Sequence, residues 1–162
     1  MLCKANFDAR ISTLFEFMSN IAENRRARFD YDILEKMEAG ILLTGQEVKS
    51  VKKGSINLKG AYITFHNDKA LLTNAHISKY PEAGPLPTYD PTHSRPLLLH
   101  KREISYLRGK SQEKGLTIIP LSVYTKNHLV KVEIGVGRGR KTHDKREVIK
   151  KRDQIREMRK MK

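Results

Sequence analysis

The sequence predicts a mainly β domain: a small closed antiparallel barrel with short flanking helices and a basic C-terminal tail. Short segments in which apolar and polar residues alternate recur along the chain, and this period of two is typical of half-buried strands. Turn-forming residues join several of these segments directly, and no regular alternation of strands with long helices is visible. Closure into a barrel would remove the exposed edges of such short strands.

Composition indicates a basic globular protein with an acidic partner. The 162 residues contain 32 Lys and Arg against 18 Asp and Glu, a net charge of +14. This excess favours nucleic acid as the partner, with an anionic membrane surface as the alternative. The single cysteine excludes an internal disulfide and fits a reducing, cytoplasmic location. No apolar run approaches the roughly twenty residues that span a bilayer, so we expect no membrane insertion.

The chain divides into three parts on charge and pattern. Residues 1–23 form an N-terminal extension that we expect to be poorly ordered, residues 24–137 form the barrel, and residues 138–162 form the tail. Charged residues interrupt residues 1–17 too often for a secretory signal. We expect Met18 to be the natural start, and an intact peptide covering residues 1–10 from the native host would contradict this.

The first half of the barrel is expected to contain one long strand and one short helix. Apolar residues alternate with acidic ones after residue 28, which predicts a strand over residues 29–43, bent or bulged near Gly40. Thr44 and Glu47 have the spacing of a capping box, in which each side chain bonds the other's backbone N–H. This pattern predicts a short helix that ends at Gly54.

A hairpin, a long loop and a second helix follow. The alternating segments 61–65 and 70–77 flank turn-forming residues and predict a β-hairpin. Residues 79–96 hold five of the six prolines, so they are expected to form a surface loop rather than a central strand. Apolar spacing then predicts a helix over residues 101–114, ended by Gly115.

Two strands complete the barrel, over residues 116–124 and 130–136. The total of about five strands, mostly joined by hairpins, makes an oligonucleotide-binding (OB) barrel the natural candidate. A sandwich and an open α+β sheet remain alternatives. The glycine-rich residues 135–139 lack the lysine of a phosphate-binding loop and are interpreted as a flexible hinge before the tail.

The tail is the most strongly charged segment. Residues 138–162 contain twelve Lys and Arg against four Asp and Glu. A helix this charged does not persist alone, but neutralisation on a polyanion would stabilise it. We therefore predict disorder in the free protein and a helix in the bound state. The alternative is a solvated basic tail that adds only nonspecific affinity.

Catalytic and metal chemistry are poorly supported by the sequence. His143 and Asp144 are adjacent and could ligate a metal, but a hydrolytic site needs further ligands on rigid elements. The six histidines show no close pairing, so neither a metal site nor a cofactor is expected. An RNA-processing enzyme that uses these two residues remains the alternative class. RNA binding is favoured instead. Strand parity places four polar side chains on the outward face, namely Tyr62, Asn74, His76 and Lys131. A polar barrel surface without a ligand would show the same pattern.

Six segments in order resemble one known family. They are residues 24–28, 38–40, 44–50, 74–77, 97–103 and 139–146. Together they are similar to the SsrA-binding protein family, also called small protein B. The likeness runs from about Asn24 to the C-terminus and provides no counterpart for residues 1–17.

The resemblance implies an OB-type barrel that binds the tRNA-like domain of transfer-messenger RNA (tmRNA). It further implies delivery of alanyl-tmRNA, with elongation factor Tu and GTP, to ribosomes stalled on truncated messages. In that process the tail would enter the empty decoding centre, contact small-subunit ribosomal RNA and fold into a helix. We expect a monomer. The alternative function is a ribosomal or ribosome-assembly protein with an electrostatic tail.

The resemblance also implies individual site residues. Those on the barrel that match the tmRNA-binding surface are Asn24, Glu38, Leu98, His100, Lys101 and Arg102. The candidate set also includes Arg25 and Arg28 of the basic entry and the outward-facing Asn74, His76 and Lys131. Those in the tail that match the decoding motif are Gly139, Lys141, His143, Asp144, Lys145 and Arg146. Two positions depart from the family pattern: Arg140 replaces a more usual lysine, and Gln154 replaces an aromatic residue of some relatives.

Overall fold

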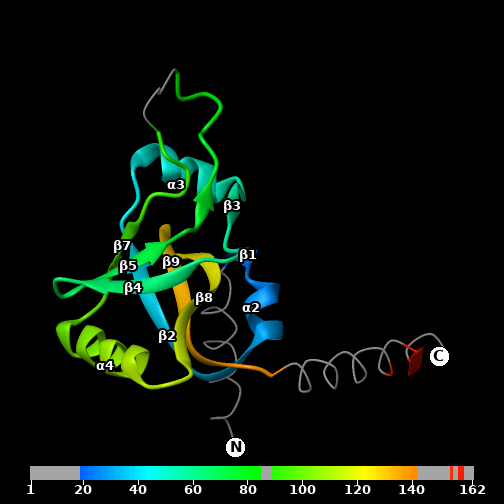
Figure 1. The fold of residues 1–162 in the computed structure, drawn as a ribbon. Coiled ribbons are helices and arrows are strands. Elements are labelled where there is room, and N and C mark those ends of the chain that lie inside the picture. Colours follow the sequence, from blue (N-terminus) through cyan, green and yellow to red (C-terminus); the bar gives the residue numbers. More distant parts are fainter. Residues whose placement is uncertain (1–18, 85–88, 142–153, 155–156, 159–162) are drawn as a thin grey trace, which may run out of the picture.

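The computed structural model describes residues 19–84, 89–141, 154, 157 and 158. In these residues one seven-stranded antiparallel sheet curves around the core, with strand order β1-β8-β9-β2-β7-β5-β4, and a two-stranded sheet pairs β3 with β6 (Figure 1). The elements are β1 Ser19–Glu23, α2 Arg25–Asp30, β2 Tyr31–Ile41, α3 Gly45–Lys52, β3 Ile56–Asn57, β4 Tyr62–His66, β5 Lys69–Thr73, β6 His76–Ile77, β7 Arg95–Leu98, α4 Lys101–Gln112, β8 Leu116–Lys126 and β9 Leu129–Gly139.

The predicted mainly β, antiparallel fold is confirmed, but the predicted closed barrel is wrong. The hydrogen-bonded ladder of the described residues ends at β1 on one side and β4 on the other. The C-terminal half of β8 pairs with β1, from Ser122 to Thr125. Its N-terminal half approaches β4 across a cavity of about 380 Å³, lined by Ile63 on one side and Thr117 on the other. Residues of α2 also line this cavity, so the helix lies at the seam where strand pairing would otherwise close the barrel.

The start of the ordered body differs from the prediction in two ways. Residues Ser19–Glu23 form β1, although residues 1–23 were all expected to be poorly ordered. Residues Arg25–Asp30 form α2, where the alternation pattern predicted the beginning of a strand. The cause is Asn24, whose Oδ1 accepts a hydrogen bond from the Ala27 N–H at 3.0 Å and caps the helix.

Strand β2 is the single long strand that the alternation predicted, but its irregularity lies elsewhere. The register shifts between Ile33 and Glu35, whereas the sequence indicated a bend near Gly40. Gly40 is required for another reason, because a Cβ at this position would lie 3.2 Å from the Cβ of Leu98 on the paired strand β7. The absence of a side chain at Gly40 therefore leaves room for the Leu98 side chain to pack against β2.

Local signals predicted helices α3 and α4 and one hairpin correctly. The Thr44–Glu47 capping box is present at the start of α3, and Gly54 just beyond the helix has a φ of +81°. The hairpin β4–β5 forms, with Tyr62 opposite Thr73. Helix α4 ends at Gln112, close to the predicted residue 114. These elements are set by contacts between residues a few positions apart.

The chain after β5 departs from the predicted single strand over residues 70–77. Asn74 has a φ of +60°, which ends β5 and turns the chain into β6 of the small sheet. Strand β7 lies at the end of the proline-rich segment and was not predicted. Pro96 is accommodated in β7 because its carbonyl still accepts a hydrogen bond from the Leu42 N–H at 2.9 Å.

The predicted glycine hinge is also wrong. Gly135 and Gly137 are buried inside β9, which continues to Gly139. A Cβ on Gly135 would lie 2.8 Å from Leu121 Cδ1, so this glycine serves close packing rather than flexibility. Beyond β9, the Arg140 N–H donates to the carbonyl of Asp30 at 2.9 Å. Most of the tail for which disorder and an induced helix were predicted, residues 142–153, 155–156 and 159–162, lies outside the described part of the chain.

The core fills the concave side of the sheet and contains one buried ion pair. Val51 of α3 and Leu107 of α4 pack into it beside the strand residues. Arg95 and Glu47 have side chains that are each 1% exposed, and Arg95 Nε lies 2.7 Å from Glu47 Oε1. The guanidinium also donates to the carbonyls of Ala75, His93 and Pro91, so it joins α3, β7 and the proline-rich loop.

Candidate nucleic-acid interface

A row of charged and hydroxyl-bearing side chains covers the outer face of strands β2, β9 and β8. We call it the Glu38 face, and its members are Lys36 and Glu38 of β2, Lys131 and Glu133 of β9, and Ser122, Tyr124 and Lys126 of β8. The strand register aligns them, because Glu38 is opposite Glu133 and Lys131 is opposite Tyr124. Side chains at paired positions of neighbouring strands project from the same side of a sheet.

Glu38 organises one end of this face. Its carboxylate accepts hydrogen bonds from the Lys131 ammonium and the Tyr124 hydroxyl, and Lys126 Nζ lies 3.4 Å away. The bond from Lys131, followed by that from Tyr124, lowers the pKa of Glu38 to about 2. Burial raises the pKa of Tyr124 above its ordinary value, and the adjacent carboxylate adds to this. At neutral pH the cluster therefore has one carboxylate that orients one phenol and two ammonium groups.

Glu133 organises the other end of the Glu38 face. Its Oε1 lies 3.4 Å from Lys36 Nζ and its Oε2 lies 3.8 Å from the Arg28 guanidinium. The Ser122 hydroxyl donates to the same carboxylate at 3.3 Å. Arg28 also pairs with Glu23 at 3.1 Å. These pairs are partly exposed, so each contributes little to stability but leaves the cations accessible to phosphates.

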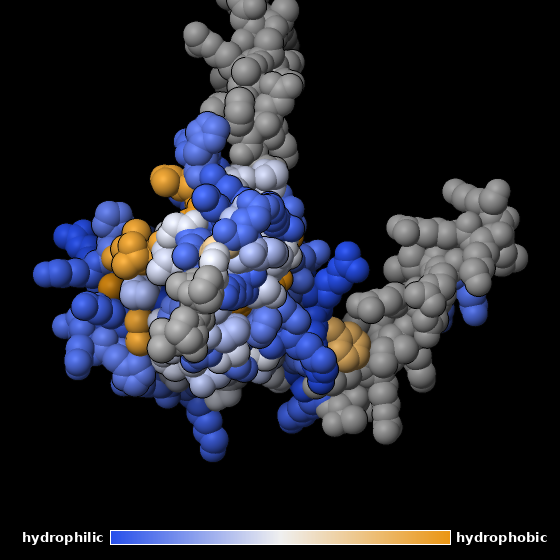
Figure 2. All heavy atoms as spheres, turned by 90° about the horizontal axis from the view of Figure 1, so that it is seen from above, coloured by the Kyte–Doolittle hydropathy of each residue, from blue (hydrophilic) through white to orange (hydrophobic). Residues whose placement is uncertain are grey.

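A hollow of about 610 Å³ adjoins the Glu38 face where β7 leads into α4. Its lining includes five residues of the predicted tmRNA-binding set: Glu38, Leu98, His100, Lys101 and Lys131. Leu98 is 60% exposed, so it offers an apolar surface beside the charged residues of this lining. On the face of the molecule that Figure 2 shows, the described residues are predominantly hydrophilic, with apolar side chains in small patches. We call the hollow between the Glu38 face and the start of α4 the α4 hollow.

Other members of the predicted set lie elsewhere. Asn24 is 6% exposed, and its Nδ2 donates to the carbonyls of Leu58 and Pro120 while its Oδ1 caps α2. The Asn74 side chain donates to Gly60 O at 3.1 Å and holds a turn. His76 belongs to the small sheet. Tyr62, Asn74 and His76 are exposed and Lys131 is partly exposed, as the predicted outward phase requires. The uninterrupted strand behind that prediction is not found, because the positive φ of Asn74 ends β5 and breaks the parity.

The three arginines of the predicted set lie in two places, near Glu133 and beside the α4 hollow. Arg28 reaches the Glu133 end of the Glu38 face, and Arg25 of the same helix is 91% exposed. Arg102 is an exposed residue of the first turn of α4, next to the α4 hollow residue Lys101.

The sequence reasoning missed several residues that shape the site. Tyr124, Lys126, Lys36 and Glu133 complete the hydrogen-bonded clusters described above. Tyr124 ends the predicted strand 116–124, whose mostly apolar sequence gives no sign that its hydroxyl faces outward. Alternation in β9 did indicate that Lys131 and Glu133 share a face. Only the register with β8 and β2 reveals their partners.

Arg140 anchors the chain where the tail leaves the body. Its Nη1 donates to the carbonyls of Arg28 and Phe29, both at 3.3 Å. Its Nη2 lies 3.5 Å from Asp32 Oδ1. Gly139 is paired with Tyr31 at the end of the sheet, and Lys141 is the last residue of this described segment. The predicted decoding residues His143, Asp144, Lys145 and Arg146 lie outside the described residues.

The described residues contain no group of three or more His, Cys, Asp or Glu side chains arranged to hold a metal ion. No helix among them is both long enough and apolar enough to cross a membrane.

Comparisons with known proteins agree with one another. A family model described as "SmpB protein" matches residues 21–162. An SsrA-binding protein of Leuconostoc mesenteroides is 54% identical over 138 residues, covering 85% of this chain and 89% of the relative. An SsrA-binding protein of Prochlorococcus marinus is 48% identical over 155 residues, covering 96% of this chain and 87% of the relative. The latter alignment also enters the N-terminal extension, for which the sequence motifs provided no counterpart.

A solved structure gives the same result for the fold. It is described as "tmRNA-SmpB: a journey to the center of the bacterial ribosome". It matches this chain with a TM-score of 0.63 and 45% sequence identity, and the match covers 75% of this chain and 85% of that chain.

Proposed function

The chain belongs to the SmpB protein family, and on this premise we propose that it binds the tRNA-like domain of tmRNA and delivers it to stalled ribosomes. There it would support trans-translation, in which incomplete proteins are tagged and the ribosome is released. The role is that of an RNA-binding protein rather than an enzyme. Elongation factor Tu with GTP would join the complex through alanyl-tmRNA, and the protein would act as a monomer.

The observation that carries this proposal is the convergence of Glu38, Leu98, His100, Lys101 and Lys131 on the α4 hollow. Lysines provide the phosphate contacts that dominate affinity for RNA. An exposed leucine and an imidazole offer surfaces against which unpaired bases can pack. Folded RNA is read through shape, backbone and unstacked bases, and a hollow edged by cations and apolar groups suits that mode of recognition.

Glu38 has a positioning role in this proposal. A free carboxylate would repel phosphates, but Glu38 is hydrogen-bonded to Lys131 and Tyr124 and lies close to Lys126. Holding the two ammonium groups reduces the side-chain entropy that they would lose when RNA binds. Removal of the carboxylate would therefore weaken RNA binding even though the local positive charge increases.

The tail has a separate role in this proposal. Gly139, Lys141, His143, Asp144, Lys145 and Arg146 would contact the empty decoding centre, and the residues beyond them would form a helix on the ribosome. Lys145 and Arg146 can pair with phosphates, and His143 can stack on a base. The RNA-binding body would thus select tmRNA, and the tail would test whether the ribosome lacks message.

A truncation tests this division. Deleting residues 139–162 would also remove Gly139 from β9 and the Arg140 contacts with α2, so a stop after Lys141 is the cleaner variant. We expect it to bind the tRNA-like domain within about twofold of the full chain and to abolish tagging on ribosomes stalled by truncated messages. Loss of most tmRNA affinity would contradict the division. Equal losses on tmRNA and plain duplex RNA in Glu38→Gln would instead favour a general ribosomal RNA-binding protein.

A further inference from the structure

A second hollow, on the side of the molecule formed by α3, shares no residue with the α4 hollow. It has a volume of about 720 Å³, within the roughly 300–1,000 Å³ range of ligand sites. Its lining comes from the start of α3 and from the segment after β6, namely Thr44, Gly45, Gln46, Lys49, Tyr80, Glu82, Ala83 and Tyr89. We call it the α3 hollow. We propose that it binds one unpaired nucleotide of RNA.

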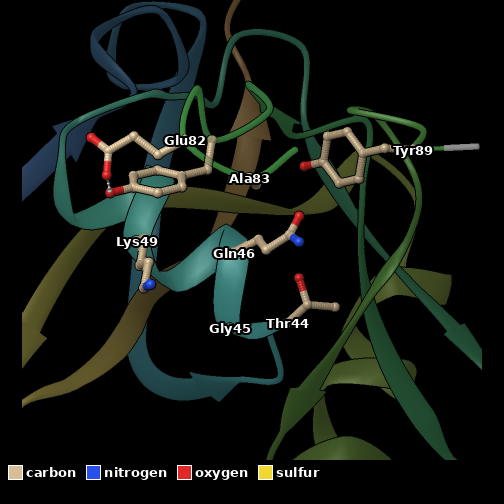
Figure 3. Close-up of a pocket in the computed structure, with 8 residues that line it drawn as sticks. Thr44, Gly45, Gln46, Lys49, Glu82, Ala83 and Tyr89 are labelled. Carbon is tan, nitrogen blue, oxygen red and sulfur yellow. Dashed lines mark hydrogen bonds between the residues drawn. The ribbon is translucent and has the colours of Figure 1, made fainter. Parts of the chain in front are cut away.

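Aromatic rings from two positions line the α3 hollow, and hydrogen bonds hold both rings in place. The Tyr89 hydroxyl donates to Ile77 O at 2.9 Å, and the Tyr80 hydroxyl donates to Glu82 Oε2 at 2.6 Å. Figure 3 shows Tyr89 and Glu82 on opposite sides of the hollow, with Gln46 between them. Rings fixed in this way can receive a planar base without losing much side-chain freedom.

Polar groups of the α3 hollow match the remaining parts of a nucleotide. The Gln46 side chain carries both a donor and an acceptor, so it can hydrogen-bond to the edge of a base. Lys49 is exposed, and its Nζ lies 5.6 Å from the centre of the Tyr80 ring. The cation paired with the nearby Glu82 is Lys53, whereas Lys49 acts on that carboxylate only through its charge. Lys49 is therefore available to a phosphate at the mouth of the hollow.

Charge favours RNA over an acidic or apolar peptide. Glu82, which is exposed, lies 3.0 Å from Lys53 Nζ and accepts the Tyr80 hydroxyl, so its charge is compensated locally. The other carboxylate nearby, Glu47, is buried against Arg95. An aromatic wall, an amide and an available lysine are the groups by which proteins bind single-stranded RNA. The inference rests on the proposed RNA-binding function but assigns it a second contact point.

The chain offers a direct test because it contains no tryptophan. Tyr80→Trp places a single fluorophore in the α3 hollow, and stacking of a base on it would quench its emission. The matched control is Tyr106→Trp on α4. The Tyr106 hydroxyl likewise donates to a glutamate, Glu35, and its ring lies 5.8 Å from a lysine Nζ, but Tyr106 does not line the hollow. It is more exposed than the partly exposed Tyr80, whose ring lies 4.5 Å from Lys53 Nζ.

Each full-length variant is titrated with three probes: the tRNA-like domain of tmRNA, protein-free ribosomal RNA, and ribosomal proteins freed of RNA. We expect saturable quenching of Tyr80→Trp by one or both RNA probes and no comparable change in Tyr106→Trp. Adding Lys49→Ala should move the midpoint of the titration to at least threefold higher RNA concentration. Which RNA quenches identifies the source of the nucleotide.

Three results would overturn the inference: no quenching by either RNA, equal quenching in the control, or quenching by the ribosomal proteins alone. In unlabelled protein, Tyr80→Leu and Gln46→Ala should weaken binding to the quenching RNA by about threefold to tenfold, and Tyr80→Phe should retain it. Affinity for the tRNA-like domain is measured by anisotropy on the same samples. Intact affinity without quenching rejects the α3 hollow, whereas loss of affinity throughout rejects the proposed function.

Discussion

Two glutamates, each paired with cations, have opposite roles in this molecule. Glu47 is 1% exposed and bonded to an equally buried Arg95. The Glu38 side chain is 34% exposed and interacts with Lys131, Lys126 and Tyr124 on the surface. Both have a lowered pKa, so ionisation alone does not distinguish them.

The difference lies in what surrounds each pair. Burial alone would raise the pKa of Glu47, but hydrogen bonds from Thr44 and the Arg95 guanidinium outweigh it. A buried charge whose partner is removed has no water to replace it, whereas a surface charge does. The Glu47–Arg95 pair should therefore govern folding, and the Glu38 cluster should govern binding. Four tests of this contrast follow, three by substitution and one by pH, from the largest expected effect to the smallest.

The largest effect is expected from Arg95→Ala. It leaves Glu47 buried without its cation and frees the carbonyls that the guanidinium joins, so the free energy of unfolding should fall by about 3–5 kcal/mol. Urea denaturation measures this. Lys53→Ala is the control, since it breaks the exposed pair with Glu82 and should change stability by less than about 1 kcal/mol. Similar losses for both variants would remove the distinction between the two kinds of pair.

Asn24→Ala tests whether a family-matched RNA-binding position acts through folding. Its side chain caps α2 and bonds two buried carbonyls, so its removal should cost about 1–3 kcal/mol. RNA binding should weaken only as the folded fraction falls, because Asn24 is buried and Arg28 on the same helix stays near Glu133 in the folded protein. We expect near-normal tmRNA affinity at low temperature, where the protein remains folded. A large loss of affinity with unchanged stability would show that Asn24 contacts RNA directly.

Substitutions in the Glu38 face should lower RNA affinity while changing stability little. Glu38→Gln and Lys131→Ala are expected to lower affinity for the tRNA-like domain by about tenfold, with stability changes below about 1 kcal/mol. Lys131→Ala should also reduce the slope of log affinity against log salt by about one, as for a lost phosphate contact. Glu38→Gln should leave that slope unchanged, because it removes no cation. Fluorescence anisotropy across a salt series separates the two.

Sequence patterns predicted the elements that depend on contacts between residues close together in the chain. The Thr44–Glu47 capping box, the β4–β5 hairpin and α4 form from residues close together in the chain. The partner of Glu47 is 48 residues away, and that of Glu38 is 93 residues away, so no periodicity reports either pair. Glu38 was identified only by family resemblance, and Arg95 was not identified.

The errors have the same origin. Gly135 and Gly137 follow a pattern that favours a hinge, yet Leu121 and Tyr31 from other strands pack where their side chains would be. Strand β1 has few strand-forming residues and depends on pairing with β8. The barrel remains open because α2, which Asn24 initiates, lies at the seam. In each case a contact distant in sequence overrides the local preference.

The smallest effect concerns acid. The pKa of Glu38 is lowered from 4.5 to about 2, so the folded protein binds this proton less readily than the unfolded chain does. Its contribution to stability is therefore complete above about pH 5 and is lost as the pH falls from 4.5 towards 2. The difference in unfolding free energy between the native chain and Glu38→Gln should narrow over this window. Because Glu38 does not titrate near neutrality, its contribution to tmRNA affinity should be constant between about pH 6 and 8. If the difference in tmRNA affinity between the native chain and Glu38→Gln changed within that range, a group other than Glu38 would be titrating. The effect of the substitution would then not come from the charge of Glu38 alone.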